Sequence, residues 1–354
     1  MNKKKFKSMP VILKGTLFFS LAALALFISN CTKKEAPALE KEMPSITAAA
    51  SSRLFTAASS RPYIWVNDLP GESGNDNIED TWAFQKAIDS MAKFPGGGDV
   101  YAKPGKYYIN ADSAIRMKSH VYLHLGDSST QLIAKPTANE RYQIIRVVNN
   151  TDVIIDGGKL VGDRDTHLGT TGEHGMGIAV YSGSHVNIIR TVIRNCWGDG
   201  IAVGSLSLYG AHDPSRVILI KHVISDNNRR QALTIGHANG VTVDSSTFTN
   251  TNGTAPQDGI DIEPDSDTAQ NITIKHCEIA YNHGQGVEEY VNSSSMVQNV
   301  IIQDNYIHDN HGHPGWFTRC HDSNCTNNRM INNTYNTIHT DNTVNCVFTP
   351  NTYQ

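Results

Sequence analysis

Short apolar strands alternate with polar turns along most of this chain, and one six-residue pattern recurs among them. The pattern places apolar residues at alternate positions. It occupies residues 176–181, 199–204, 231–236, 258–263 and 285–290. Successive copies begin roughly 27 residues apart. Alternation with a period of two predicts β-strands that each bury one face.

Two further apolar strands accompany each six-residue unit. The second strand recurs at 186–189, 217–220, 241–243, 272–274 and 300–302. A third is marked by apolar pairs at 192–193, 223–224 and 306–307. Three short strands cannot bury a face alone, but stacked repeats can. We therefore predict an all-β fold, a right-handed parallel β-helix built as a three-sheet solenoid. A Greek-key sandwich would not repeat strand by strand, and the spacing of leucine-rich repeats is absent.

Asparagines recur just before the six-residue units. They are Asn195, Asn227, Asn250, Asn282 and Asn310. Asparagines stacked at a bend can donate hydrogen bonds to one another from coil to coil. The sequence therefore predicts an asparagine ladder at one bend of the solenoid.

One segment near the start of the repeats has a helical period instead. Phe84, Ile88 and Met91 fall on one stripe of residues 78–93, and Pro-Gly-Gly-Gly at 95–98 ends the pattern. We expect this helix to cap the N-terminal end of the solenoid, where a sheet edge would otherwise be exposed.

The first 30 residues have the features of a bacterial export signal. Residues 1–15 carry five lysines and no acidic residue, and 16–29 are apolar but shorter than the roughly 20 residues of a membrane span. Cys31 follows after Asn30, which resembles a lipoprotein signal, in which the cysteine becomes the lipidated first residue. A simple secretory signal cleaved nearby is the alternative. We predict an exported protein, either an outer-membrane or cell-surface lipoprotein or a periplasmic or secreted one.

Composition supports a globular protein behind this signal. Charged residues make up 18% and hydrophobic residues 39% of the chain. Residues 31–61 are rich in Ala, Ser, Pro and charge, which predicts a flexible tether, and 62–354 form the predicted β-helix domain. The formal charge is −4, and removal of residues 1–30 makes it more negative. An acidic protein is a poor partner for nucleic acid, and we expect membrane contact only through the lipid at Cys31. The pattern leaves the oligomeric state open.

The remaining cysteines fall into two groups. Cys196 and Cys277 lie in predicted strands or turns, where cysteine behaves as a small hydrophobic residue. Cys320, Cys325 and Cys346 cluster near the C-terminus. Export permits a disulfide among these three, but the spacing does not determine the pair.

The N-terminal part of the predicted domain carries a family pattern. It consists of Tyr63-Ile-Trp-Val, Asp80-Thr-Trp-Ala-Phe-Gln-Lys-Ala-Ile88 and the glycine-rich run from Gly96 to Tyr107. These residues resemble the pectate-lyase superfamily, whose members have the pectin-lyase fold, and the resemblance covers about residues 63–340. It implies a right-handed parallel β-helix and chemistry on glycans. The superfamily includes lyases, hydrolases, sugar epimerases and glycan-cleaving phage tail fibres, so the fold alone does not choose the reaction.

Acidic residues gather on the outward face of the six-residue units. Equivalent outward positions hold Ala179, Ala202, Thr234, Asp261 and Glu288. Neighbouring coils are about 4.8 Å apart, so Asp261 and Glu288 should be stacked neighbours. Glu263 should share their face, Asp258 should border it, and Glu289 should join the same patch.

Carboxylates this close repel, so some other interaction must compensate. A Ca²⁺ ion held by Asp258, Asp261 and Glu263 would do so. A raised pKa that keeps one carboxyl protonated as a catalytic acid would do so as well. The alternative is a solvated acidic surface with ordinary pKa values.

Basic, aromatic and further acidic residues surround this patch in the predicted register. Arg230 can act as a base or bind a uronate carboxylate, and the alternative is a structural ion pair with Asp258 or Asp199. His174 can act as an acid or base near neutral pH, although a loop histidine is often only solvated. Residues expected to contact the substrate are Asp199, Trp197, Arg229, Glu173, Tyr181 and Tyr290.

These residues predict an extracytoplasmic polysaccharide-processing enzyme that cleaves a uronate-containing glycan by β-elimination. In that reaction Arg230 or His174 would be the base, Tyr181 or Tyr290 the acid, and the carboxylates would hold the cation. A glycoside hydrolase that uses the pair formed by Glu288 with Asp258 or Asp261 is the first alternative. A non-catalytic glycan-binding β-helix protein at the cell surface is the second.

Overall fold

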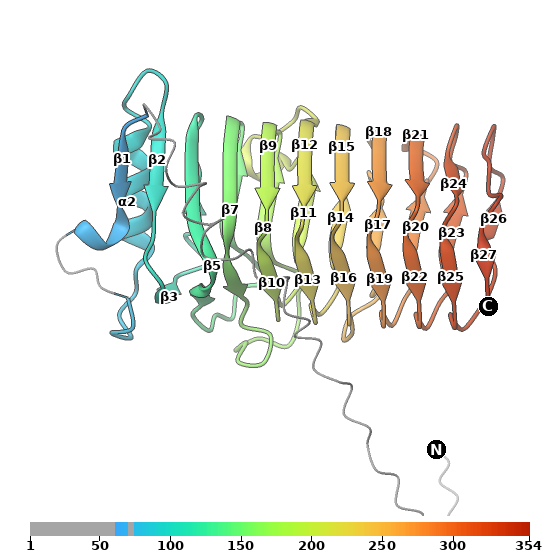
Figure 1. Ribbon diagram of the computed structural model, residues 1–354, viewed down its shortest axis with the longest axis horizontal. Coiled ribbons are helices and arrows are strands. Elements are labelled where there is room, and N and C mark those ends of the chain that lie inside the picture. The colour runs from blue at the N-terminus through green and yellow to red at the C-terminus, as the bar shows by residue number, and fades with distance from the viewer. Residues whose placement is uncertain (1–60, 70–73) are drawn as a thin grey trace, which may run out of the picture. The chain divides into compact units, whose positions relative to one another are not determined.

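The computed structural model describes residues 61–69 and 74–354 (Figure 1). The predicted signal, the lipidation residue Cys31 and nearly all of the predicted tether lie outside these residues, so those predictions stay predictions. The described residues form a right-handed parallel β-helix, which confirms the predicted fold. Its coils stack from the N-terminal to the C-terminal end (Figure 1).

Each coil contributes a strand to each of three parallel ladders, which we call sheets 1, 2 and 3. Sheet 1 has nine strands. They are β4 (Ile115–Arg116), β6 (Arg141–Val148), β8 (His174–Tyr181), β11 (Ile201–Gly204), β14 (Leu233–Ile235), β17 (Ile260–Ile262), β20 (Val287–Tyr290), β23 (Gly315–Thr318) and β26 (His339–Asp341). The six-residue units of the sequence are the strands β8 to β20 of this sheet and the turns before them.

Sheets 2 and 3 follow sheet 1 in each coil. Sheet 2 contains β1 (Tyr63–Trp65), β2 (Gly98–Tyr101), β5 (Val121–Ala134), β7 (Thr151–Val161), β9 (Ser184–Ile189), β12 (Ser215–Lys221), β15 (Ala238–Asp244), β18 (Thr268–Lys275), β21 (Met296–Gln303) and β24 (Asn324–Thr326). Sheet 3 contains β3 (Gly105–Ile109), β10 (Val192–Arg194), β13 (Ile224–Asp226), β16 (Thr247–Thr249), β19 (Glu278–Ala280), β22 (Tyr306–His308), β25 (Arg329–Ile331) and β27 (Thr352–Tyr353). The long strands β5 and β7 run through both sheets.

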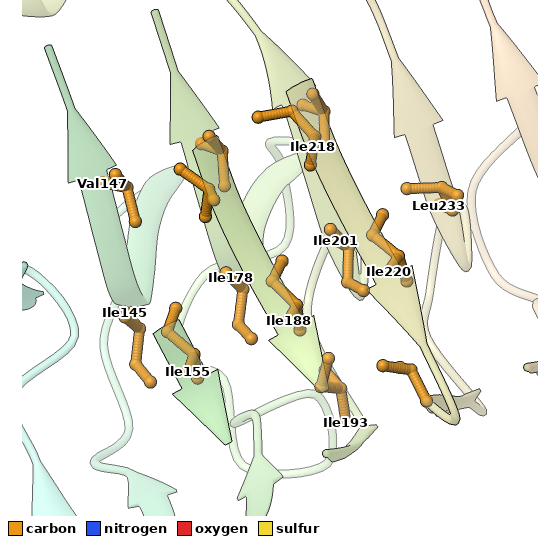
Figure 2. Close-up of a cluster of buried hydrophobic side chains, with 14 of the residues drawn as sticks. Ile145, Val147, Ile155, Ile178, Ile188, Ile193, Ile201, Ile218, Ile220 and Leu233 are labelled. Carbon is orange, nitrogen blue, oxygen red and sulfur yellow. The ribbon is translucent and has the colours of Figure 1, made fainter. Parts of the chain in front are cut away.

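Aliphatic residues stack on one another inside the solenoid. Ile178 pairs in register with Ile201, which pairs with Leu233 on the next coil. Across the interior, Ile188 pairs with Ile220 (Figure 2). All five side chains have no exposed surface. Full burial of such a side chain contributes about 1.5–3 kcal/mol, so the repeated column stabilises each coil that it crosses.

The helix α2 (Thr81–Met91) lies at the N-terminal end of the solenoid, as predicted (Figure 1). Phe84, Ile88 and Met91 are buried, and the helix contacts β1, β2 and β4. Two short 3₁₀ helices, η1 (Val66–Asp68) and η2 (Ser207–Tyr209), lie in connecting segments. Among the described residues, no helix has the length and apolar character needed to cross a bilayer.

The predicted asparagine ladder exists, but its register was partly wrong. Asn282 donates from Nδ2 to Oδ1 of Asn310 at 2.9 Å, and Asn310 donates likewise to Asn333 at 2.9 Å. Three members of the predicted set, Asn195, Asn227 and Asn250, instead occupy the preceding position, where φ is 57°, 53° and 61°. Asn227 still donates from Nδ2 to Oδ1 of Asn195 at 2.9 Å, so this part of the predicted stack is also hydrogen-bonded. Asparagine tolerates this left-handed conformation better than most residues. The same residue type therefore serves two adjacent positions of the bend.

A second internal ladder was not predicted from the sequence. Asn305 donates from Nδ2 to Asn328 at 3.0 Å, and Asn328 donates to Asn351 at 3.1 Å. Asn305 and Asn328 are almost fully buried. Buried amides of this kind satisfy backbone groups at the turns, which would otherwise lose hydrogen bonds on folding.

Candidate active site

The register of sheet 1 places acidic residues on adjacent coils. Thr234 of β14 pairs with Asp261 of β17, and Asp261 pairs with Glu288 of β20. Trp316 of β23 and His339 of β26 continue this outward column. The repeat therefore predicted the column correctly as far as Glu288, and the last two members were not singled out.

Three carboxyl groups converge at this place. Asp258, in the turn before β17, approaches Asp261 and Glu288 so closely that one oxygen of each lies within 4.8 Å of the others. Asp258 has no exposed surface and Asp261 has 1%, whereas Glu288 is half-buried. Glu263 is half-buried just after β17 and adds negative charge near Asp261. It is not among the three that converge.

A buried glutamine holds the two aspartates in position. Gln231 donates from Nε2 to Oδ2 of Asp261 at 2.8 Å, and its Oε1 accepts from the backbone N–H of Asp258 at 2.6 Å. The backbone N–H of Gln285 donates to Oδ1 of Asp258. Gly284 leaves room for that carboxyl, because a Cβ there would lie 2.2 Å from the same oxygen.

No role for Gln231 was predicted from the sequence. Its place at the start of a six-residue unit, equivalent to Asp258 one coil later, was a usable signal. Equivalent positions on adjacent coils are neighbours, so this position places the amide of Gln231 beside Asp258 and Asp261.

Burial and mutual repulsion change the acidity of this cluster. Burial first, and then the charge of Glu288, raises the pKa of Asp258 well above its usual range. Burial, followed by the charges of Glu263 and Glu288, raises the pKa of Asp261 in the same way. Burial also raises the pKa of Glu288, while its interaction with Asp258 opposes that rise. The cluster therefore retains protons that isolated carboxyl groups would lose.

Two carboxyl oxygens of the cluster lack ordinary donors. Oδ2 of Asp258 and Oδ1 of Asp261 are buried, and no N–H or hydroxyl group of the described chain donates to them. Such atoms are costly unless a proton, a cation or a ligand compensates them. The arrangement thus suits either an acid that shares protons between carboxyl groups or a cation site.

Arg230 does not have the surroundings of a base. Its guanidinium lies 3.2 Å from Asp199 and 3.3 Å from Glu173 in ion pairs, and Asp199 raises the pKa of Arg230 further. The structure thus favours the structural ion pair with Asp199, the alternative to catalysis. Asp199 is buried and also accepts hydrogen bonds from Thr234 and from the backbone of Gln231, so it anchors the coil.

Trp197 and Arg229 pack against each other. The guanidinium of Arg229 lies 3.8 Å from the ring centroid of Trp197, and the ring of His167 stacks on that tryptophan at 4.0 Å. Arg229 also donates to the carbonyl of Gly172 at 2.7 Å. Both residues therefore brace the loop before β8, and the indole is packed instead of open to a sugar.

The three remaining candidates, Tyr181, Tyr290 and His174, differ in how far they are exposed. Tyr181 at the end of β8 is only 6% exposed, and its ring stacks on Tyr209 of η2 at 5.8 Å. Tyr181 is thus nearly as buried as Asp258 and Asp261, and its predicted role as a proton donor to a bound glycan stays a prediction. Tyr290 at the end of β20 is 39% exposed. His174 is half-buried, and burial followed by the charge of Arg141 lowers its pKa, which favours a neutral imidazole.

Glu289 does not belong to the acidic patch, contrary to the prediction. It points into the solenoid with no exposed surface, in register between Ile262 and Phe317. Its Oε2 accepts a hydrogen bond from Ser323 at 2.7 Å. Burial raises its pKa from 4.5 to about 7.

Glu289→Gln should therefore change how stability depends on pH. Folding disfavours ionisation of Glu289, so its contribution to stability is complete below pH 4.5 and is lost as the pH rises through about 7. Between these pH values the variant should become more stable relative to the native chain. The difference in the free energy of unfolding should reach at most about 3 kcal/mol, and the unfolding temperature should rise with it. Thermal denaturation from pH 4 to 9 measures this, with the exposed Glu140→Gln as the control. A constant difference across the range would contradict it.

Comparison with known proteins agrees with the fold. The family described as "Right handed beta helix region" matches residues 115–299 and 209–354. The uncharacterized protein YclG of Bacillus subtilis (strain 168) is 31% identical over 191 residues, which are 48% of this chain and 31% of YclG. Iota-carrageenase of Alteromonas macleodii is 35% identical over 77 residues, 22% of this chain and 14% of that enzyme. This chain thus matches about a third or less of the length of these relatives.

A solved structure also shares the β-helix fold. The tailspike protein gp49 from Acinetobacter baumannii bacteriophage Fri1, a capsular polysaccharide depolymerase, superposes with a TM-score of 0.53 and 15% identity. The superposition covers 82% of this chain and 57% of gp49. At this identity the likeness concerns the fold. Enzymes that act on polysaccharides are thus among the proteins that share it.

Proposed function

Because this chain belongs to the family of right-handed β-helix proteins, we propose that it is a polysaccharide-processing enzyme with Asp258, Asp261 and Glu288 at its active site. The observation that carries the proposal is the convergence of three carboxyl groups within 4.8 Å, two of them buried and with raised pKa values. A merely solvated acidic surface would have exposed carboxylates with ordinary pKa values.

Hydrolysis of a glycosidic bond is the reaction that this geometry supports best. Hydrolysis needs one protonated carboxyl to donate to the leaving oxygen and one ionised carboxyl to assist attack. Asp258 and Asp261, with raised pKa values, suit the acid. Glu288 is the most exposed of the three and suits the ionised partner. Gln231 fixes the spacing of the aspartates, and Arg230 with Asp199 holds the adjacent coil.

β-Elimination from a uronate-containing glycan is the second candidate, and the two buried oxygens without donors favour it. They can bind a Ca²⁺ ion together with Glu288, which takes the place predicted for Glu263. Such an ion would neutralise the uronate carboxylate beside the departing proton. His174, whose pKa is lowered, suits the base better than Arg230 does.

The place of action is proposed from the sequence alone. We expect the N-terminal segment to direct export and Cys31 to carry the lipid that holds the protein at a membrane surface. A polysaccharide outside the cytoplasm would then be within reach of the solenoid.

The experiment that tests the function is a product assay on a panel of neutral, sulfated and uronate polysaccharides, with Ca²⁺ or with a chelator. New reducing ends without ultraviolet absorbance would support hydrolysis. Calcium-dependent absorbance of an unsaturated uronate would support β-elimination. Binding of a glycan without either product would overturn the enzymatic proposal in favour of a glycan-binding protein.

A further inference from the structure

Two cysteines lie in contact near the C-terminal end of the solenoid. Cys320, just after β23, is fully buried, whereas Cys346 in the last coil is partly exposed. Their Sγ atoms are 3.7 Å apart. The third cysteine of this region, Cys325, is buried, and its sulfur accepts a hydrogen bond from Nδ2 of Asn328 at 3.4 Å. The contact thus selects one pair from the three that the sequence leaves open.

The backbone keeps this pair together. His321 and Val344 form a parallel bridge, and the N–H of Val344 donates to the carbonyl of Cys320 at 3.0 Å. The N–H of Ser323 also donates to Sγ of Cys346 at 3.4 Å. A disulfide requires the sulfurs to approach to about 2.05 Å. Rotation of the side chains and a small shift of the last coil can close the gap, because β26 pairs only with β23 in the part of the chain that the structure describes.

We propose that Cys320 and Cys346 form a disulfide that clamps the last coil onto the coil before it. The oxidant is a low-molecular-weight disulfide, which supplies the two-electron acceptor that the chain lacks. The thiolate of one cysteine attacks this disulfide, forms a mixed disulfide and releases one thiol. The second cysteine then attacks its partner's sulfur, and its proton leaves with the second released thiol. Two protein thiols are oxidised, and one small disulfide is reduced to two thiols.

The burial of the two residues sets the order of these steps. Cys346 is the one that an external disulfide can reach. Burial, followed by the charge of Glu289, raises the pKa of Cys320, so this residue stays a thiol until the mixed disulfide is beside it. The predicted export would bring the chain into a compartment where disulfides persist.

A clamp at this place would matter for stability. Among the described residues, the coil that holds Cys346 pairs with a neighbouring coil on one side only, and such coils tend to unfold first. The bond would close a loop between residues 26 apart in sequence, which restricts the unfolded chain. The clamp is independent of the proposed catalytic activity.

The test uses the full chain incubated with oxidised or reduced glutathione. Free thiols are then alkylated, and the digested protein is analysed by mass spectrometry. We expect a peptide pair joined through Cys320 and Cys346 after oxidation, and an unfolding temperature about 5 °C or more above that of the reduced chain. Cys346→Ser should lose both the pair and the response to oxidation. Val344→Ala, in the same coil and 44% exposed, should keep both.

Three results would overturn the proposal. They are alkylation of both thiols after oxidation, a bond that joins Cys325 to either residue, and a Cys320–Cys346 bond that leaves the unfolding temperature unchanged.

Discussion

Asp261→Asn should lower kcat/KM on the polysaccharide substrate by roughly 10²–10⁴-fold, the contribution of a positioned acid or base. Asparagine has the size of aspartate, and its Oδ1 can still accept the hydrogen bond from Gln231. It can neither donate the acidic proton nor carry the charge that the reaction needs. Steady-state kinetics on the substrate found in the product assay would measure the loss.

The stability of the same variant separates lost chemistry from lost structure. Folding raises the pKa of Asp261, so its ionised form destabilises the folded chain. Above that pKa, Asp261→Asn should unfold at the same temperature as the native chain or at a higher one. Asp265→Asn is the matched control, because Asp265 is exposed on the same segment and its φ of 55° suits asparagine. Activity close to native in Asp261→Asn would remove this residue from the mechanism.

Asn310→Ala should destabilise the folded chain by about 2–4 kcal/mol, because several buried polar groups lose their partners at once. Oδ1 of Asn310 accepts from the backbone N–H of Asn282 at 3.1 Å and from its Nδ2 at 2.9 Å. Nδ2 of Asn310 donates to the carbonyl of Ile279 at 3.1 Å and to Asn333 at 2.9 Å. Alanine can replace none of these bonds, and water cannot easily reach a residue that is 1% exposed.

Chemical denaturation of Asn310→Ala beside Asn187→Ala would measure this effect. Asn187 lies in β9 and is only half-buried, so its loss should cost less than about 0.5 kcal/mol. Equal losses in the two variants would mean that the ladder contributes no more than a surface amide does.

The sequence predicted sheet 1 well, because two simple periods act there together. Alternation along a strand assigns each residue to the inside or the outside. The repeat then assigns it a neighbour on the next coil. These two rules predict Asp261 beside Glu288, and the register of β17 and β20 confirms it.

The bends of the solenoid were harder to predict. A bend residue such as Asn227, with φ of 53°, turns the chain within one position, so equivalent asparagines can face different ways. The predicted ladder mixed two such positions for this reason. Glu289 shows a related error. Strict alternation in β20 points its side chain inward, but burial of an acid is costly, so an outward position was predicted. The hydrogen bond that compensates for the burial comes from Ser323, which lies 34 residues later in the chain.

The sequence by itself determined the parallel β-helix, the helix at its N-terminal end and the column of outward acidic residues. All of these follow from local periodicity, which each strand carries within itself. Only the tertiary structure decided that Asp258 converges with Asp261 and Glu288, that Arg230 is held by Asp199 and Glu173, and that the η2 segment covers Tyr181. These contacts join turns and loops from different coils. Turns have no period, so their side-chain directions are set by packing against neighbours that the local sequence does not specify.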